Sequence, residues 1–166
     1  MIHEHEGSLD GQGLRIAIIA AQFNEHITSL LVDGAKSALG EHGVRDEDTL
    51  IAKVPGSFEL PLVADKLART GQWDAVVCVG AIIRGETAHF DHICRTATDG
   101  LSEISRQTGV PVILGILTTY NVEQAMERAG GRVGNNGYNV TESAIRMVNL
   151  LKQLKLANKR GVAIPH

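Results

Sequence analysis

One strand-turn-helix stretch near the middle of the chain constrains the fold more than any other feature. It opens with a nearly unbroken apolar run, Asp74-Ala-Val-Val-Cys-Val-Gly80, which is typical of a parallel strand covered on both faces. The turn Arg84-Gly85-Glu86-Thr87 follows, and apolar spacing from Ile93 then predicts a helix that ends at Gly109. Thr87 is the expected N-cap of this helix. A turn of this kind, with free helix N–H groups above a sheet, favours binding of an anion such as phosphate.

His89 lies just inside the predicted helix, within reach of a group bound at the turn. An imidazole in that place can donate and accept protons near neutral pH. The spacing fits equally well with His89 and His92 as partly exposed helix residues that have no chemical role. A metal site of His89, His92 and Cys94 is the weakest interpretation, because Cys94 points away from the helix face that the two histidines share.

The rest of the chain repeats the strand-helix pattern. Apolar strand patterns cover residues 14–21, 49–54 and 111–119, and a helical period follows each of them. A glycine-rich link at residues 130–137 precedes a last helix with one apolar face. Strands that alternate with helices four times predict an α/β fold, here a three-layer α/β/α sandwich with a four-stranded parallel sheet.

Length and composition predict how this fold is organised. We expect a single domain over residues 14–156, since 166 residues are too few for two ordinary domains. Residues 1–13 are predicted to form an N-terminal arm, of a kind that pairs with a neighbouring subunit, and residues 157–166 a mobile tail.

Charge and cysteine content indicate which partners and which cellular compartment to expect. The net charge of −3 lacks the excess of positive charge that is typical of nucleic-acid-binding proteins. Two cysteines, one in a predicted buried strand, do not make a disulfide framework and fit a reducing setting. The first residues are acidic where a signal peptide is basic, and no apolar run approaches membrane-spanning length. We therefore expect a soluble, cytoplasmic protein without a nucleic-acid or membrane partner.

Polar and aromatic residues follow the predicted strands at their carboxyl ends, where ligands bind to parallel α/β sheets. The segments that this rule brings together are Phe23, Ser57-Phe58-Glu59, residues 81–89 and residues 114–119. An aromatic ring, a carboxylate beside a hydroxyl, a phosphate turn and a histidine suit a planar heterocycle that bears a polyol, bound next to a small phosphorylated compound.

The same motifs, in the same order, resemble the 6,7-dimethyl-8-ribityllumazine synthase family over residues 6–156. The resemblance rests on Phe23-Asn24, Pro55 to Pro61, Gly80 to Ile93, Gly115 to Thr119, and Arg128-Ala-Gly-Gly131 with Gly134-Asn-Asn-Gly137. It implies a flavodoxin-like sheet and a transferase of riboflavin biosynthesis. That enzyme condenses 5-amino-6-(D-ribitylamino)uracil with 3,4-dihydroxy-2-butanone 4-phosphate and releases phosphate and water, without a cofactor or a metal.

The resemblance also implies roles for individual residues, with His89 as the proton-transfer residue. Residues implied to bind the ribitylaminouracil are Phe23, Asn24, Ser57, Phe58, Glu59, Ala81, Ile82, Ile83 and Leu114, and those implied at the butanone phosphate are Glu86, Thr87 and Arg128. Phe23 is expected to stack on the pyrimidine, and residues 81–83 to meet its edge through backbone groups. The carboxylate of Glu86 has to point away from the phosphate.

Two positions depart from the family pattern. Leu114 stands where the family often has Phe, and it offers an apolar wall with less stacking area. Asn136 stands where the family usually has Lys, so the segment can donate a hydrogen bond but brings no charge. The role of Asn136 therefore stays open at this point.

The resemblance further implies an assembly. In the family each site lies between two subunits of a pentamer, and the regions of Leu114 and Arg128 come from the neighbour. The short link at residues 130–137 favours members in which twelve pentamers form a sixty-subunit icosahedral shell, and riboflavin synthase is a candidate partner protein.

Two other functions compete with catalysis. One is a non-catalytic lumazine-binding, flavin-binding or shell-forming homologue, in which Leu114 and Asn136 mark lost chemistry. The other is a flavodoxin-like phosphate-binding regulatory domain, which leaves Phe23 and Ser57-Phe58-Glu59 unexplained.

Overall fold

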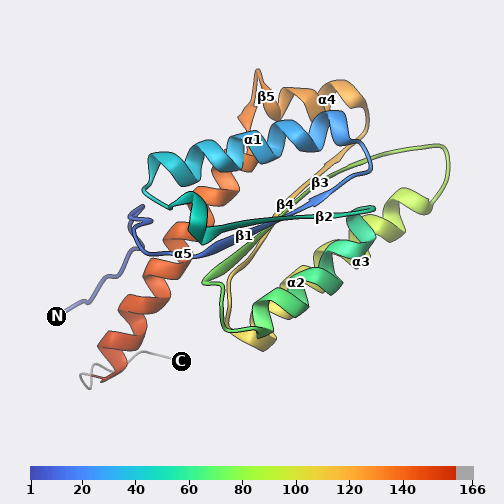
Figure 1. The fold of residues 1–166 in the computed structure, drawn as a ribbon. Coiled ribbons are helices and arrows are strands. Elements are labelled where there is room, and N and C mark those ends of the chain that lie inside the picture. Colours follow the sequence, from blue (N-terminus) through green and yellow to red (C-terminus); the bar gives the residue numbers. More distant parts are fainter. Residues whose placement is uncertain (160–166) are drawn as a thin grey trace.

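A four-stranded parallel sheet forms the middle layer of the molecule. The computed structural model describes residues 1–159. The strands are Ile16–Ala21 (β1), Thr49–Val54 (β2), Ala75–Ile83 (β3) and Val112–Thr119 (β4), and their order in the sheet is β2-β1-β3-β4 (Figure 1). All neighbouring pairs are parallel. This confirms the predicted flavodoxin-like sandwich with a four-stranded sheet.

Helices cover both faces of the sheet. Glu25–Glu41 (α1) and Asn136–Lys159 (α5) lie on one face, while Leu60–Arg69 (α2) and His89–Thr108 (α3) lie on the other (Figure 1). The sheet is therefore buried on both sides, as a nearly continuous apolar sequence requires. Side chains of β1 alternate between two cores, because Ile16 and Ile18 pack toward α1 and α5 whereas Ala17 and Ile19 pack toward α2 and α3.

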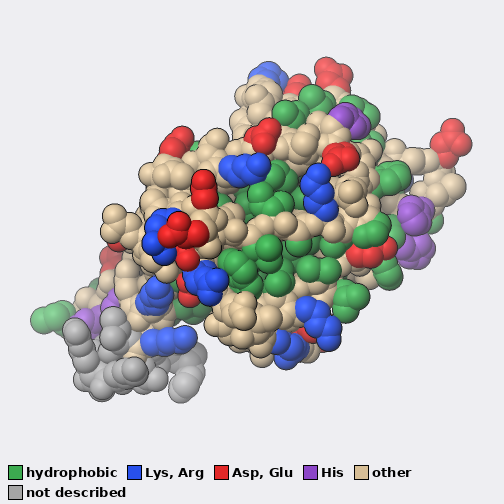
Figure 2. Space-filling model, in the orientation of Figure 1, with side chains coloured by type: hydrophobic (Ala, Val, Ile, Leu, Met, Phe, Trp, Pro, Cys, Tyr) green, Lys and Arg blue, Asp and Glu red, His purple; other side chains and the backbone are tan. Residues whose placement is uncertain are grey.

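Strand β2 is the edge of the sheet next to β1. It is only partly buried, and the side chain of Ile51 is exposed. Figure 2 shows apolar side chains on both sides of this edge, and histidine side chains at the end of the molecule where α3 begins. The two central strands β1 and β3 are much more deeply buried. The carboxyl ends of these central strands are thus held in place by the core below them.

Five short elements complete the fold, three of them helical. Asp46–Asp48 (η1) and Ser57–Glu59 (η2) are single 3₁₀ turns, and the first precedes β2 while the second follows it. Val122–Glu127 (α4) follows β4, and Asn121 caps it as its side chain accepts a hydrogen bond from Gln124 N at 2.8 Å.

The glycine-rich link predicted at residues 130–137 is an ordered hairpin. Ala129–Gly131 (β5) pairs antiparallel with Gly134–Asn135 (β6), and α5 begins at once at Asn136. Gly130 and Gly134 have φ angles of 108° and 107°, which let the chain reverse here. The Asn135 amide donates to Leu30 O at 2.9 Å and so ties the hairpin to α1.

Two boundaries around the central turn differ from those predicted. Strand β3 runs three residues past Gly80 to Ile83, because β4 continues to Thr119 and offers it a partner. Helix α3 begins at His89 with Ala88, not Thr87, in the N-cap position and without a side-chain cap. Thr87 Oγ1 nevertheless accepts a long hydrogen bond of 3.4 Å from His89 N, so it still supports the helix start.

The N-terminal arm lies along α5 of its own chain. Gln153, Asn149 and Arg146 of α5 donate side-chain hydrogen bonds to carbonyl groups of residues 6–8 at 2.8 Å, 2.9 Å and 3.4 Å. Gly7 is needed there, because a β-carbon at this position would collide with Arg146 O. At the other end of the chain, α5 reaches Lys159, and the remainder of the predicted tail, residues 160–166, lies outside the described residues. None of the helices within residues 1–159 is both long and apolar enough to span a membrane.

Candidate functional site

A cavity of about 710 Å³ lies at the carboxyl ends of β1, β2 and β3. It gathers most of the residues that the sequence predicted for the site. Its lining consists of Phe23, Asn24, Pro55, Gly56, Ser57, Phe58, Glu59, Ala81, Ile82, Ile83, Gly85, Thr87, His89, Phe90 and Ile93. We call this cavity the rim pocket.

The rim pocket sits at the switch point of the sheet. From β1 the chain moves outward to β2, and it then returns to β3 on the other side of β1 and moves on to β4. Connections that leave two adjacent strands in opposite directions open a crevice between their carboxyl ends. The pairing of β1 with β3 ends at Ala20 and Val79, whereas β3 stays paired with β4 up to Ile83. The backbone of residues 81–83 therefore borders the crevice.

The loop after β1 carries the first aromatic ring of the site. The Phe23 side chain is 72% exposed, and its backbone N–H donates to Pro55 O at 3.0 Å. Asn24 follows with φ 60° and ψ 43°, a left-handed conformation. Its carbonyl accepts hydrogen bonds from Ile27 N and Thr28 N, which start α1, and its side-chain amide donates to Ala81 O at 2.8 Å. This loop is thus attached to β2, β3 and α1 together.

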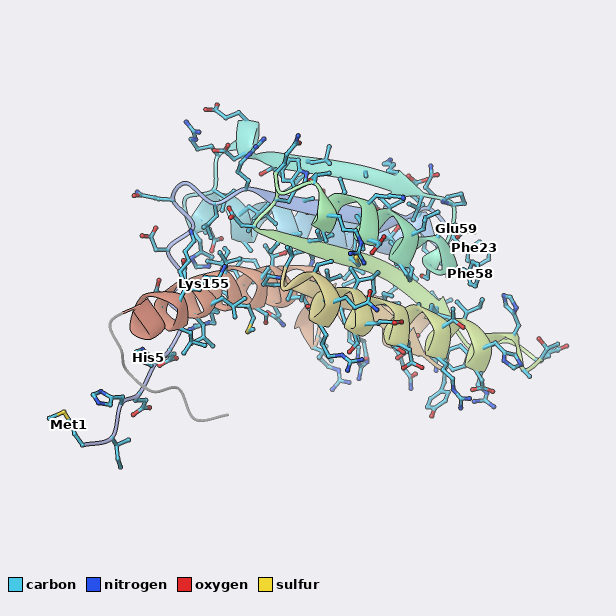
Figure 3. The ribbon with its side chains drawn as sticks, turned by 90° about the horizontal axis from the view of Figure 1, so that it is seen from below. Met1, His5, Phe23, Phe58, Glu59 and Lys155 are labelled. Atoms are coloured by element: carbon cyan, nitrogen blue, oxygen red, sulfur yellow. The ribbon has the colours of Figure 1, made fainter. Side chains whose placement is uncertain are left out.

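The turn after β2 adds a second ring and a carboxylate. Phe58 is 57% exposed, whereas Ser57 is buried, with 6% exposure. Figure 3 shows Phe23, Phe58 and Glu59 close together at one end of the molecule. Two exposed rings beside a carboxylate provide flat apolar surfaces and an acceptor of hydrogen bonds. Such a surface suits a planar heterocycle with hydroxyl groups.

The turn before α3 closes the other side of the rim pocket. Gly85, Thr87 and His89 line it, and all three are exposed. At the start of α3, His89 N donates to Thr87 Oγ1, and Asp91 N and His92 N donate to Ala88 O. The N–H of Phe90 has no partner among the described residues, and a free N–H at a helix N-terminus favours an anion. Phe90 and Ile93 also line the pocket, although neither was predicted as a site residue. For Ile93 the available signal was its spacing from His89, since residues four apart share a helix face. The position of Phe90, next to His89 in sequence, had no such signal.

Four of the residues with an implied role do not line the rim pocket, namely Glu86, Leu114, Arg128 and Asn136. The expectation that residues 114–119 meet the other segments there is also wrong, because residues 116–119 line a different pocket. Arg128 and Asn136 instead line a separate pocket of about 290 Å³ beside the end of β4. Asn136 N donates to Arg128 O at 2.8 Å, so the two residues are directly linked. Leu114 is 45% exposed and lines neither pocket. One chain therefore carries two separate groups of predicted site residues.

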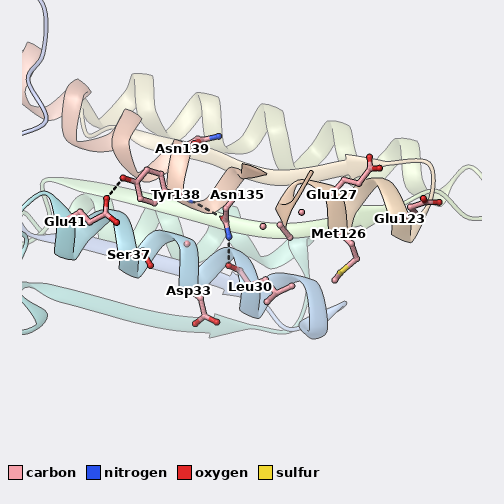
Figure 4. A pocket seen from close by; sticks show the side chains of 14 residues that line it. Leu30, Asp33, Ser37, Glu41, Glu123, Met126, Glu127, Asn135, Tyr138 and Asn139 are labelled. Atoms are coloured by element: carbon pink, nitrogen blue, oxygen red, sulfur yellow. Dashed lines mark hydrogen bonds between the residues drawn. The ribbon is translucent and has the colours of Figure 1, made fainter. Parts of the chain in front are cut away.

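A third groove, of about 740 Å³, lies between α1, α4 and α5 (Figure 4). Four carboxylates line it, those of Asp33, Glu41, Glu123 and Glu127, and none of its lining residues is Lys or Arg. Figure 4 shows Tyr138 donating to Glu41 along its wall, at 2.5 Å. This acidic groove repels a phosphorylated compound. The rim pocket is therefore the better candidate for the binding of an anionic substrate.

The two thiols are unsuited to nucleophilic chemistry. Burial raises the pKa of Cys78, and burial followed by the charge of Asp91 raises the pKa of Cys94. A thiol with a raised pKa remains protonated near neutral pH, and the thiol is a much weaker nucleophile and metal ligand than the thiolate. In residues 1–159, His, Cys, Asp and Glu side chains nowhere form a group of three that could hold a metal ion.

Comparison with known proteins agrees with this geometry. The family model described as 6,7-dimethyl-8-ribityllumazine synthase matches residues 13–152. A curated protein from Desulfatibacillum aliphaticivorans, named 6,7-dimethyl-8-ribityllumazine synthase, is 51% identical over 150 residues, which are 90% of this chain and 97% of that protein.

Proposed function

Because the chain belongs to the 6,7-dimethyl-8-ribityllumazine synthase family, we infer that it is a transferase of riboflavin biosynthesis. It condenses 5-amino-6-(D-ribitylamino)uracil with 3,4-dihydroxy-2-butanone 4-phosphate to 6,7-dimethyl-8-ribityllumazine, with release of phosphate and water. The high identity over nearly the whole chain favours this activity over a non-catalytic homologue.

The observation that carries the proposal is the composition of the rim pocket at the switch point. Phe23, Phe58 and Glu59 lie at one end of it, and the start of α3 with His89 closes the other side. In our proposal the pyrimidine stacks on Phe23, and the ribityl hydroxyls bind near Glu59. The Ser57 hydroxyl packs toward Gly80 of β3, so we propose that Ser57 contributes to ribityl binding through its backbone.

Backbone groups of β3 are proposed to bind the pyrimidine edge. Peptide groups in a strand alternate between its two sides. Ala81 O faces the β1 side, where Asn24 donates to it, and Arg84 N faces the β4 side, where it donates to Thr119 O at 2.9 Å. By this alternation the N–H and C=O of Ile83 face the crevice, and those of Ile82 face β4. Ile83 thus supplies the polar groups, and Ile82 supplies side-chain contact.

The start of α3 is proposed to hold the phosphate of the butanone. The Thr87 hydroxyl and the free N–H of Phe90 supply hydrogen bonds. His89 lies next to them and transfers protons while the amine attacks the ketone, water leaves, phosphate is eliminated and the ring closes. Glu86 lines no part of the pocket, which is consistent with a carboxylate directed away from the anion.

Arg128, Asn136 and Leu114 are proposed to act on the site of a neighbouring subunit. They lie outside the rim pocket of their own chain, while Arg128 and Asn136 share a second pocket. A ring of identical subunits places one surface of each chain against a different surface of the next. A pentamer in which each complete site combines the rim pocket of one subunit with the Arg128 region of its neighbour accounts for this separation.

The direct test of the activity is a kinetic assay with both substrates. Purified protein is mixed with the ribitylaminouracil and the butanone phosphate, and the fluorescence of the lumazine product is followed against a control without protein. We expect a clear acceleration over the control. If the ribityl compound binds but turnover does not exceed the control, the chain is a non-catalytic binding protein.

The shared site is tested by mixing two strongly impaired variants. His89→Ala damages the rim pocket, and Arg128→Ala damages the second pocket. Random co-assembly of equal amounts leaves about one quarter of the sites with both halves intact, so activity should return to that fraction. If activity does not return although sedimentation shows mixed oligomers, the site lies within one chain. The icosahedral shell, riboflavin synthase as a partner and a cytoplasmic location stay predictions.

A further inference from the structure

We propose that Asn24 is a positioning residue that acts through Phe23, not a residue that binds substrate with its own side chain. Its amide ties the loop after β1 to the projecting end of β3, and this holds the Phe23 ring over the rim pocket. The inference rests on the proposed function, in which Phe23 stacks on the pyrimidine. It assigns Asn24 a role different from the substrate-binding role that the sequence implied.

The backbone of Asn24 is the first observation. Within residues 1–159, Asn24 is the one non-glycine residue with a positive φ. This region of φ and ψ is unfavourable for most side chains, and Asn and Asp tolerate it best. Such conformations persist where the surrounding structure fixes them, often at functional sites. The chain turns sharply at Asn24, directly after the exposed ring of Phe23.

The hydrogen bonds on both sides of the crevice are the second observation. Gln22 N and Phe23 N both donate toward the β2 side, to Val54 O at 2.8 Å and Pro55 O at 3.0 Å. Neither is therefore available to Ala81 O on the β3 side. The amide of Asn24 supplies this bond at 2.8 Å, across 57 residues of sequence. It thus bridges β1 and β3 above the point where their pairing ends.

The side chain of Asn24 does not serve α1. Asparagine before a helix commonly caps it through its side-chain oxygen. Here the N-cap Asn24 makes no side-chain cap bond, and only its backbone carbonyl accepts from Ile27 N and Thr28 N. The amide is directed to Ala81 instead. One N–H of this amide thus fixes the loop that carries Phe23, and in our proposal Asn24 acts on the substrate through this loop.

Three variants separate the bond from the backbone conformation and from stability. Asn24→Gly keeps the left-handed conformation and removes the amide. Asn24→Asp keeps the shape but places a carboxylate oxygen against the carbonyl of Ala81. The matched control is Asn149→Ala on α5, because the Asn149 amide also donates to backbone carbonyls, to Ser8 O at 2.9 Å and Asp10 O at 2.8 Å, far from the rim pocket.

The KM for the ribitylaminouracil and kcat are measured for each variant, with thermal unfolding to confirm that it is folded. Loss of one hydrogen bond should raise this KM about three- to tenfold in Asn24→Gly, and at least as much in Asn24→Asp. We expect kcat and the KM for the butanone phosphate to change less than about twofold, because the phosphate end is untouched. Asn149→Ala should leave all three constants unchanged.

A double-mutant cycle with Phe23→Ala decides whether Asn24 acts through Phe23. If it does, adding Asn24→Gly to Phe23→Ala should raise the KM by less than about twofold further, because the ring to be positioned is gone. If the KM of the double variant instead rises by the product of the two single increases, Asn24 acts independently of Phe23 and the inference is overturned. Turnover of the unaltered protein tests the proposed function separately. A result against the role of Asn24 is therefore distinguishable from absence of the activity.

Discussion

Ser57 Oγ occupies the space into which a β-carbon at Gly80 would project, at a separation of 2.6 Å. The next nearest atoms to that β-carbon, Ala21 Cβ and Leu60 Cδ1, would lie at 3.5 Å and 3.6 Å, in ordinary contact. Glycine at position 80 thus lets the turn after β2 pack directly on β3, immediately before the residues that border the rim pocket.

We predict that Gly80→Ala destabilises the protein and that Ser57→Ala rescues it. The added methyl group collides with a buried hydroxyl, and overpacking of this kind costs about 1–3 kcal/mol. Removal of Oγ leaves only ordinary contacts, so the double variant should recover most of the loss. Urea unfolding of the four proteins measures this. Equal stabilities for Gly80→Ala and the double variant would show that the contact with Ser57 Oγ is not the cause of the destabilisation.

His89→Ala should slow turnover about 10²–10⁴-fold without abolishing it, because loss of acid-base help leaves the positioning of the two substrates intact. His92→Ala is the matched control, since His92 lies on the same helix but does not line the rim pocket. We expect a nearly normal kcat for His92→Ala. Undiminished turnover in His89→Ala would remove this residue from the mechanism.

Asn136→Lys should lower the KM for the butanone phosphate about threefold to tenfold, since an ammonium group beside Arg128 adds a charge-assisted contact to an anion. The effect should weaken at high salt, which screens the charge. Asn136→Gln keeps an amide without a charge and serves as the control. If both variants have the same KM as the unaltered protein, this segment has only a structural role.

Comparison with Tyr138→Phe should show that the hydrogen bond from Tyr138 to Glu41 stabilises the folded protein, and that this stabilisation is lost at alkaline pH. The hydrogen bond to Glu41, then burial, raises the pKa of Tyr138 to about 12 from its ordinary value near 10. The protonated phenol is therefore favoured in the folded state, and its stabilisation is full below pH 10 and is lost as the pH rises toward 12. Urea unfolding of both proteins from pH 8 to 11 measures the difference. A difference that does not shrink above pH 10 would exclude this bond as its cause.

The sequence predicted the layers of the fold well, because burial on both faces gives parallel strands an apolar pattern that is easy to recognise. Strand β2 was predicted over its full length, from Thr49 to Val54. The hairpin at residues 129–135 was not predicted, since its order depends on a tertiary contact from Asn135 to Leu30. The extension of β3 was missed for a similar reason, because it requires β4 as a partner.

The candidate site was predictable in composition but not in arrangement. The strand-end rule brought Phe23, Glu59 and His89 to one rim, as the structure has them, but it wrongly included residues 114–119. The resemblance implied that the Arg128 region serves a neighbouring subunit, and Arg128 and Asn136 do lie in a different pocket of the chain. Sequence alone could not reveal the left-handed backbone of Asn24, because that conformation is fixed by contacts with strands distant in sequence.

The course of the N-terminal arm determines where an added domain would emerge. Met1 and His5 lie at the end of the molecule opposite Phe23, Phe58 and Glu59 (Figure 3). The attachment of residues 6–8 to α5 holds the start of the chain on that side. A fluorescent protein or an antigen fused before Met1 therefore lies on the side of the molecule opposite the rim pocket. Such a fusion leaves the entry of substrate to the rim pocket unobstructed.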